Sequence, residues 1–301
     1  MAWYFYALFA AIGITIVGVL QKKTLKQEHS LEYVALLNMA KLIVFLLLFS
    51  QVLDLRITSV QFVVLGISGF VGACALLFTA RAMRAMELSS VLPILALDPA
   101  IVAVLAFFLL GEGLSINKIM GLGMTLVGTF VLEFHNANHE HLAELFRRPK
   151  HLLVPFRNFG RGPGGRSLLI AVSALAMGGI LDRYLLVRVE VPTFMFYNYL
   201  FGSILYLLLL AGSGQRIGMP TFGKKSFVGL VLLTAAINVL ANASQAKATS
   251  LAAVGLVIAV KRISVLLDIA IAGKLFHERH LLQKSIASVI ILLGIYLIVL
   301  P

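Results

Sequence analysis

Charged residues are scarce in this chain, and that scarcity excludes an ordinary soluble domain. Only 13% of its 301 residues are charged, whereas about a quarter are charged in an average soluble protein. The chain also has a single cysteine, Cys74. It can therefore build neither an internal disulfide nor a thiolate metal cluster from its own residues.

Apolar residues make up 60% of the chain and give a mean hydropathy of +0.99. They gather in ten segments of about 20 residues, the length that a helix needs to cross the hydrocarbon core of a bilayer. Strands of a membrane barrel would alternate polar and apolar residues, and that alternation is absent. The predicted spans are 2–20, 31–50, 60–80, 88–110, 116–134, 167–187, 193–212, 226–247, 250–273 and 281–300.

The two halves of the sequence resemble each other. A shift of 166 residues places the first five spans on the last five without a gap, with Glu112 on Glu278 and Lys118 on Lys284. Because each half has an odd number of spans, the second half must enter the membrane from the opposite side. The predicted fold is an all-α membrane protein with ten transmembrane helices in two inverted five-helix repeats, residues 1–134 and 167–301.

The segment between the repeats, residues 135–166, is rich in Arg and Lys and ends in GRGPGGRS. It contains four histidines without the compact spacing of a metal site, so we interpret it as a solvated linker loop. A phosphate-binding GxxxxGK[ST] loop is absent from the chain. We expect no metal, no cofactor and no ATP-driven step.

Two stretches carry a resemblance to a known family: MELSSVLPILALDPAIVAVLAFFLLGEGLSINKIMGLGMTLVGTFVL (86–132) and AVGLVIAVKRISVLLDIAIAGKLFHERHLLQKSIASVIILLGIYLIVL (253–300). With ten spans in two repeats, the chain resembles the drug/metabolite transporter superfamily, in particular its EamA-type members. The resemblance implies a transporter. The adjacent Lys261 and Arg262 also resemble the Lys-Arg pair with which plastid sugar-phosphate translocators of this superfamily hold phosphate.

Ionisable side chains inside predicted spans are costly and mark functional sites. More of them are basic than acidic, which predicts an anionic substrate that neutralises the excess. An internal brace, in which Lys261 or Arg262 pairs with an aspartate, is the alternative. The aspartates are also candidates for charge pairing or for carrying a coupling proton. The full set is Lys41, Asp98, Asp182, Arg183, Lys261, Arg262 and Asp268.

Amide side chains form the second part of the predicted site. Asn238, Asn242 and Gln245 are spaced to lie on one face of a helix. Asn38 shares a face with Lys41, and Asn198 lies in the seventh span. We predict substrate binding by these amides together with Lys41, Asp98, Lys261 and Arg262. Hydrogen bonds between helices would explain the same residues.

The favoured function is a secondary active transporter that moves a small anionic or phosphate-bearing metabolite by alternating access. A flippase for a lipid-linked phosphate, or an amino-acid or drug exporter of the same fold, is the alternative. An intramembrane enzyme is disfavoured, because His277 and His280 are three residues apart rather than the four of HExxH. The expected partners are the solute and membrane lipids, with no nucleic acid, and the protein is expected to be a monomer or homodimer.

The basic residues predict the orientation. Loops after the odd-numbered spans carry most of the Lys and Arg, whereas the other loops hold few. The positive-inside rule then makes both termini face outward, away from the cytoplasm, although the resemblance alone implies cytoplasmic termini. The expected location is the inner membrane of a bacterium.

Overall fold

The structure is a computed structural model, and every regular element among the residues that it describes is a helix. The described residues are 3–26, 29–95, 97, 100–101, 115–134, 162–186, 188–213, 225–251, 263–277 and 281–299.

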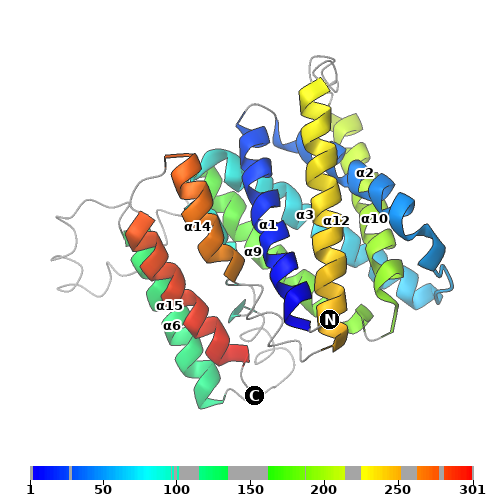
Figure 1. Ribbon diagram of the computed structural model, residues 1–301. Coiled ribbons are helices and arrows are strands. Elements are labelled where there is room, and N and C mark those ends of the chain that lie inside the picture. The colour runs from blue at the N-terminus through cyan, green and yellow to red at the C-terminus, as the bar shows by residue number, and fades with distance from the viewer. Residues whose placement is uncertain are drawn as a thin grey trace.

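Most of the helices are long rods (Figure 1). Their bounds are α1 Trp3–Leu25, α2 Ser30–Phe49, the 3-10 turn η1 Ser50–Val52, α3 Ser59–Ala85, α4 Leu88–Leu95, α6 Ile116–Phe134, α9 Pro163–Leu186, α10 Val191–Ser213, α12 Lys225–Leu251, α14 Ile263–Leu275 and α15 Leu281–Val299.

Seven helices in the described part of the chain are long and apolar enough to cross a membrane. They are α1, α2 with its 3-10 extension, α3, α9, α10, α12 and α15. Many of their large apolar side chains are exposed, such as Leu47 and Phe70. An outward apolar surface is expected where lipid replaces water as the solvent. The protein is therefore an integral membrane protein that crosses the bilayer several times.

Several helix ends differ from the sequence prediction. Helix α3 continues to Ala85, five residues past the predicted span, so Arg81 and Arg84 lie in a helix rather than in a loop. At this end of the helix, the ammonium of Lys22 donates hydrogen bonds to the carbonyls of Met83 and Met86.

Helix α9 also begins earlier than predicted, at Pro163, inside the segment interpreted as a linker loop. Proline suits the first position of a helix because its ring presets φ and its missing N–H has no helical partner there. The predicted spans 88–110 and 250–273 are described only in part, through α4, the end of α12, and α14.

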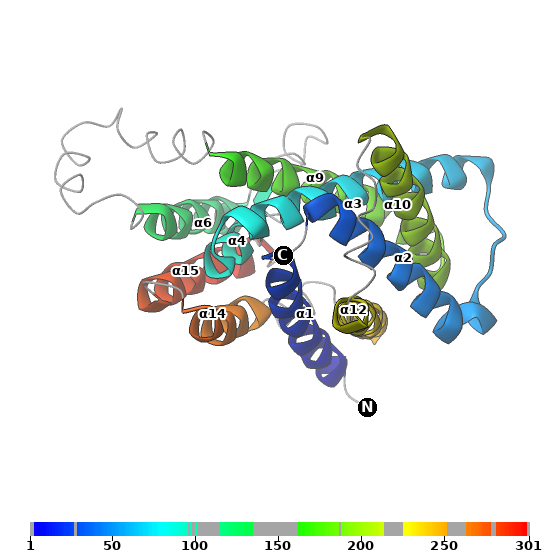
Figure 2. The ribbon, with the colours of Figure 1, turned by 90° about the horizontal axis from the view of Figure 1, so that it is seen from above.

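The long helices pack in antiparallel pairs. In the α1–α12 pair, Ala7 lies in one small cluster with Ala248, and Gly13 lies against Ala241. The α3–α9 pair runs in opposite directions in the same way, with Gly178 against Val71 near the middle. Helix α2 contacts both α10 and α12, and Figure 2 shows it between them.

Helices α6 and α15 form a separate antiparallel pair at one side of the molecule (Figures 1 and 2). Their backbones meet at Gly121 and Gly294, and a second close approach joins Gly128 to Ala287. Because glycine and alanine stand at these points, the two backbones come closer than larger residues would allow, as is common where membrane helices associate through small residues.

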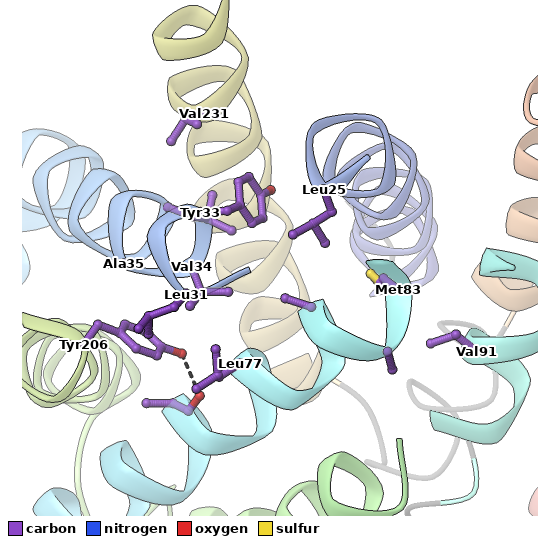
Figure 3. Close-up of a cluster of buried hydrophobic side chains, with 14 of the residues drawn as sticks. Leu25, Leu31, Tyr33, Val34, Ala35, Leu77, Met83, Val91, Tyr206 and Val231 are labelled. Carbon is purple, nitrogen blue, oxygen red and sulfur yellow. Dashed lines mark hydrogen bonds between the residues drawn. The ribbon is translucent and has the colours of Figure 1, made fainter. Parts of the chain in front are cut away.

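The largest buried cluster lies where α1, α2, α3 and α10 meet, and it extends to residues of α4, α9, α12 and α15 (Figure 3). Tyr33 and Tyr206 are its largest fully buried side chains. The hydroxyl of Tyr206 donates a hydrogen bond to the carbonyl of Ala73 at 2.6 Å, which satisfies a polar group that would be costly in an apolar interior. This cluster fixes α2 against α3 and α10, and so positions the polar side chains of α2.

Candidate solute-binding site

Lys41 is a buried cation in the middle of α2. It lies eleven positions from each end of the span Ser30–Val52, or about 16 Å from either end at 1.5 Å per residue. Its side chain is only 7% exposed. The ammonium lies 6.0 Å from the ring centroid of Tyr199 on α10, which is at the limit of a cation–π contact. Over the described residues, no carboxylate forms an ion pair with it.

Asn38 lies one turn before Lys41 on the same face and joins α2 to α10. Its amide nitrogen donates hydrogen bonds to the backbone carbonyl of Tyr199 at 2.8 Å and to the hydroxyl of Ser203 at 3.0 Å. Gly202 makes room for it, since a Cβ at that position would lie 2.9 Å from the amide nitrogen. The sequence and the structure therefore agree that Asn38 and Lys41 share a buried face.

Two asparagines of α12 complete this cluster. The amide nitrogen of Asn242 donates to the hydroxyl of Tyr199 at 3.3 Å and to the amide oxygen of Asn238 at 3.1 Å. Gln245 lies one turn further along α12 and is half-buried. We call the residues Asn38, Lys41, Tyr199, Ser203, Asn238 and Asn242 the Lys41 cluster.

A second polar group lies next to it between α3, α9 and α10. The hydroxyl of Ser68 donates to the carboxylate of Asp182 at 2.8 Å and accepts a hydrogen bond from the amide of Asn198 at 3.4 Å. Asn198 directly precedes Tyr199 of the Lys41 cluster. Gly72 borders the amide oxygen of Asn198, where a Cβ would approach to 3.3 Å. Asp182 and Asn198, both predicted from the sequence, are thus brought together by a serine.

Asp268 lies apart from both groups, between α14 and α1. Its side chain is 2% exposed, and its Oδ1 has no hydrogen-bond partner in the described structure. Gly18 of α1 borders the same oxygen, at 3.6 Å from where a Cβ would be. The adjacent hydroxyl of Thr15 donates to the carbonyl of Ser264. Asp268 is therefore a buried acid that the structure does not join to the Lys41 cluster.

Three predicted site residues, Asp98, Lys261 and Arg262, lie outside the described residues. Arg183 lies in α9, but its side chain is not among those described. The predicted phosphate grip by Lys261 and Arg262 stays a prediction, as does a brace between these residues and an aspartate.

Sequence reasoning gave too little weight to three residues that connect the site. Tyr199 is not among the predicted site residues, yet it is buried and contacts Asn38, Lys41 and Asn242. Ser68 and Ser203 were not singled out. The only signal for them was their position beside glycines, which marks close helix contacts but does not distinguish a hydrogen-bonding serine from a packing one.

The Lys41 cluster offers one buried cation, amide donors and acceptors, a phenol and a serine hydroxyl. Such groups bind a polar or anionic solute by charge and hydrogen bonds. Nothing in the cluster resembles a nucleophile with an adjacent base.

The comparisons with known proteins agree with this reading of the fold. The chain matches the EamA-like transporter family over residues 1–134 and 164–300, and it belongs to that family. It is therefore a membrane transporter. A crystal structure of a protein with 15% sequence identity superimposes with a TM-score of 0.62, covering 97% of this chain and 95% of the other. No curated protein matches the chain significantly.

Proposed function

We propose that this protein is a secondary active transporter that moves a small anionic or phosphate-bearing metabolite by alternating access, and that the Lys41 cluster is part of its solute site. The observation that carries the proposal is the burial of Lys41 at the middle of a membrane span. A lysine at the centre of a membrane helix costs about 2.5–3.5 kcal/mol. In the described structure an aromatic face, and no acid, offsets that cost.

An anionic solute would supply the missing counter-charge. The ring of Tyr199 lies 6.0 Å from the ammonium, and its hydroxyl is linked through Asn242 to Asn238. This hydroxyl and these amides would bind the solute's oxygens. Because Asn38 and Tyr199 hold α2 against α10, while Asn242 holds α12 against α10, the solute would contact three helices at once. A site shared by several helices is what alternating access requires.

The packing of related helices supports the inverted repeats. The 166-residue shift relates α2 to α10 and α6 to α15, and both pairs pack against each other in antiparallel directions. It also relates the α1–α12 contact to the α9–α3 contact, which is antiparallel as well. Antiparallel packing of equivalent helices is expected if the second repeat is inverted. We infer that the two repeats exchange conformations around the Lys41 cluster.

The orientation in the membrane is part of the same proposal. The basic ends of α1 and α3 meet the start of α9, where Gly164 contacts Met86. The end of α14 joins them, since the ammonium of Lys26 lies 4.4 Å from the ring of Phe276. This end of the bundle, which we call the basic end, would face the cytoplasm under the positive-inside rule. Both termini would then be outside, in the inner membrane of a bacterium.

Energy for transport would come from exchange with a second solute or from a proton gradient. Asp182 is half-buried and Asp268 is buried, and the structure leaves both without a cationic partner among the described side chains. Asp98 is the third candidate. Lys261 and Arg262 would add positive charge to the solute site.

The test compares the stability and the transport activity of the Lys41→Met variant with those of the wild type. Candidate solutes are first screened by their effect on the thermal unfolding of the purified protein, because a ligand that binds the folded state stabilises it. The solute with the largest effect is then used in uptake and exchange by proteoliposomes. We expect Lys41→Met to lower transport at least about tenfold and to leave the unfolding temperature unchanged or raised, since an unpaired buried charge is removed.

The matched control is Lys274→Met, which removes an exposed lysine at the end of α14. It should leave both stability and transport unchanged. Normal transport by Lys41→Met, or a loss of transport that only follows a loss of folded protein, would show that Lys41 is a structural residue.

A further inference from the structure

A cleft of about 380 Å³ opens at the basic end of the bundle, away from the Lys41 cluster. Its described lining consists of His29 and Ser30 at the start of α2, and of Arg81, Arg84 and Ala85 at the end of α3. Ligand sites commonly have volumes of about 300–1,000 Å³. The cleft is therefore large enough for a phosphate group and part of the molecule that carries it.

The two arginines of the cleft are one helical turn apart and exposed. Arg81 stacks on the ring of Phe78, with its guanidinium carbon 5.1 Å from the ring centroid. Neither guanidinium forms an ion pair or a hydrogen bond within the described structure. Guanidinium groups bind phosphate in a bidentate manner and stay protonated at all physiological pH values.

A structural role at the end of α3 does not account for these arginines. Basic residues often hydrogen-bond the last carbonyls of a helix. Here Lys22 already donates to the carbonyls of Met83 and Met86. The guanidinium groups of Arg81 and Arg84 are therefore available to bind a ligand in the cleft.

The start of α2 adds backbone donors to the same cleft. His29 occupies the N-cap position in an extended conformation, and its side chain makes no capping hydrogen bond. The first N–H groups of a helix have no helical partner and carry partial positive charge, which favours anions. Ser30, the first residue of α2, lines the cleft, so this positive helix end and the two guanidinium groups converge on one volume.

We propose that this cleft binds a phosphate group, held by Arg81 and Arg84 on one side and by the start of α2 on the other. Arg84 lies at the end of the span Ser59–Ala85, which is the depth of lipid headgroups. The phosphate can come from the headgroup of an anionic phospholipid or from a soluble phosphate compound. In either case, the ligand would join α2 to α3 at one end of the helix that carries Lys41.

The experiment measures thermal unfolding of the detergent-purified full chain with four additions: phosphatidylglycerol, phosphatidylcholine, sodium phosphate, and sodium chloride at the same ionic strength. The variants are Arg81→Gln, Arg84→Gln and the double variant. Lys23→Gln is the control, because Lys23 is an exposed cation near the same end that does not line the cleft. Native mass spectrometry counts bound phosphatidylglycerol on each variant.

We expect phosphatidylglycerol to stabilise the wild type and the control more than phosphatidylcholine does. Each single variant should lower the affinity about tenfold, as expected for one charged hydrogen-bonding group. If only phosphatidylglycerol stabilises the protein, the phosphate belongs to a lipid headgroup. If sodium phosphate stabilises the protein more than sodium chloride does, the phosphate belongs to a soluble compound.

Three results would overturn the proposal. They are the absence of both responses in the wild type, a full response in the double variant, and a loss in Lys23→Gln as large as that in the arginine variants. Both arginines are exposed, so the variants are expected to fold. If the double variant does not fold, the number of phosphatidylglycerol molecules bound to each single variant tests the proposal instead.

Discussion

The close crossing of α6 and α15 can be tested with two alanine substitutions on one helix. A Cβ on Gly121 would lie 2.5 Å from the carbonyl oxygen of Gly294 and 2.9 Å from the backbone nitrogen of Ile298. A Cβ on Gly123, two residues away, would have no neighbouring atom within 4 Å. The variants Gly121→Ala and Gly123→Ala therefore make the same chemical change in different surroundings.

The expected magnitudes follow from this geometry. Ordinary contacts begin at 3.4 Å, so the backbones would have to separate by about 0.9 Å, the difference from 2.5 Å. Overpacking of this kind costs about 1–3 kcal/mol. Replacing glycine by alanine in a helix gains about 0.8–1 kcal/mol. Gly121→Ala should lower the free energy of unfolding by up to about 2 kcal/mol after this gain, whereas Gly123→Ala should leave it unchanged or raise it.

The assay is unfolding of the purified protein in mild detergent, by heating or by titration with a denaturing detergent, followed by circular dichroism. Gly121→Ala should lower the midpoint, whereas Gly123→Ala should leave it unchanged or raise it. Equal midpoints would show that α6 and α15 do not cross at Gly121. They would also weaken the support that this antiparallel pair gives to the inverted repeats.

Two further predictions concern buried polar contacts. Lys22→Met should lower the unfolding temperature by several degrees, because it removes the donor to two carbonyls at the end of α3. Lys23→Met removes the exposed neighbouring ammonium and should have little effect. Similar shifts for the two variants would disprove the capping role of Lys22. Tyr206→Phe should cost about 1 kcal/mol, because it removes the hydrogen bond to Ala73. Tyr296→Phe, at an exposed tyrosine, is its control, and an unchanged midpoint for Tyr206→Phe would contradict the structure.

Part of the candidate site was predictable from periodicity. Asn38 and Lys41 are three residues apart, and Asn238 and Asn242 are four apart, so each pair had to lie on one helix face. A lysine in an apolar run must face the protein interior rather than lipid. These arguments use only local helix geometry, and the structure places all four side chains as they require.

The relation between these faces was not predictable in the same way. Tyr199 joins them because α10 packs against α2 and reaches α12, and each contact links residues more than forty positions apart. The boundary of α3 likewise depended on Lys22, which is 61 residues from Met83. Hydropathy averages over a window of neighbours and contains no information about such partners.

The sequence by itself determined that the chain crosses a membrane and that a few charged residues lie where charge is costly. Those properties follow from composition and spacing, since a bilayer excludes unpaired polar groups wherever they stand. Only the tertiary structure decided which of these groups meet. Lys41 lies near the ring of Tyr199, Asp182 accepts a hydrogen bond from Ser68, and Asp268 lies apart from both pairs. The reason is that helix contacts in a membrane depend on the shapes of the helix surfaces and on the small residues at their crossings, which become neighbours only after the helices have packed.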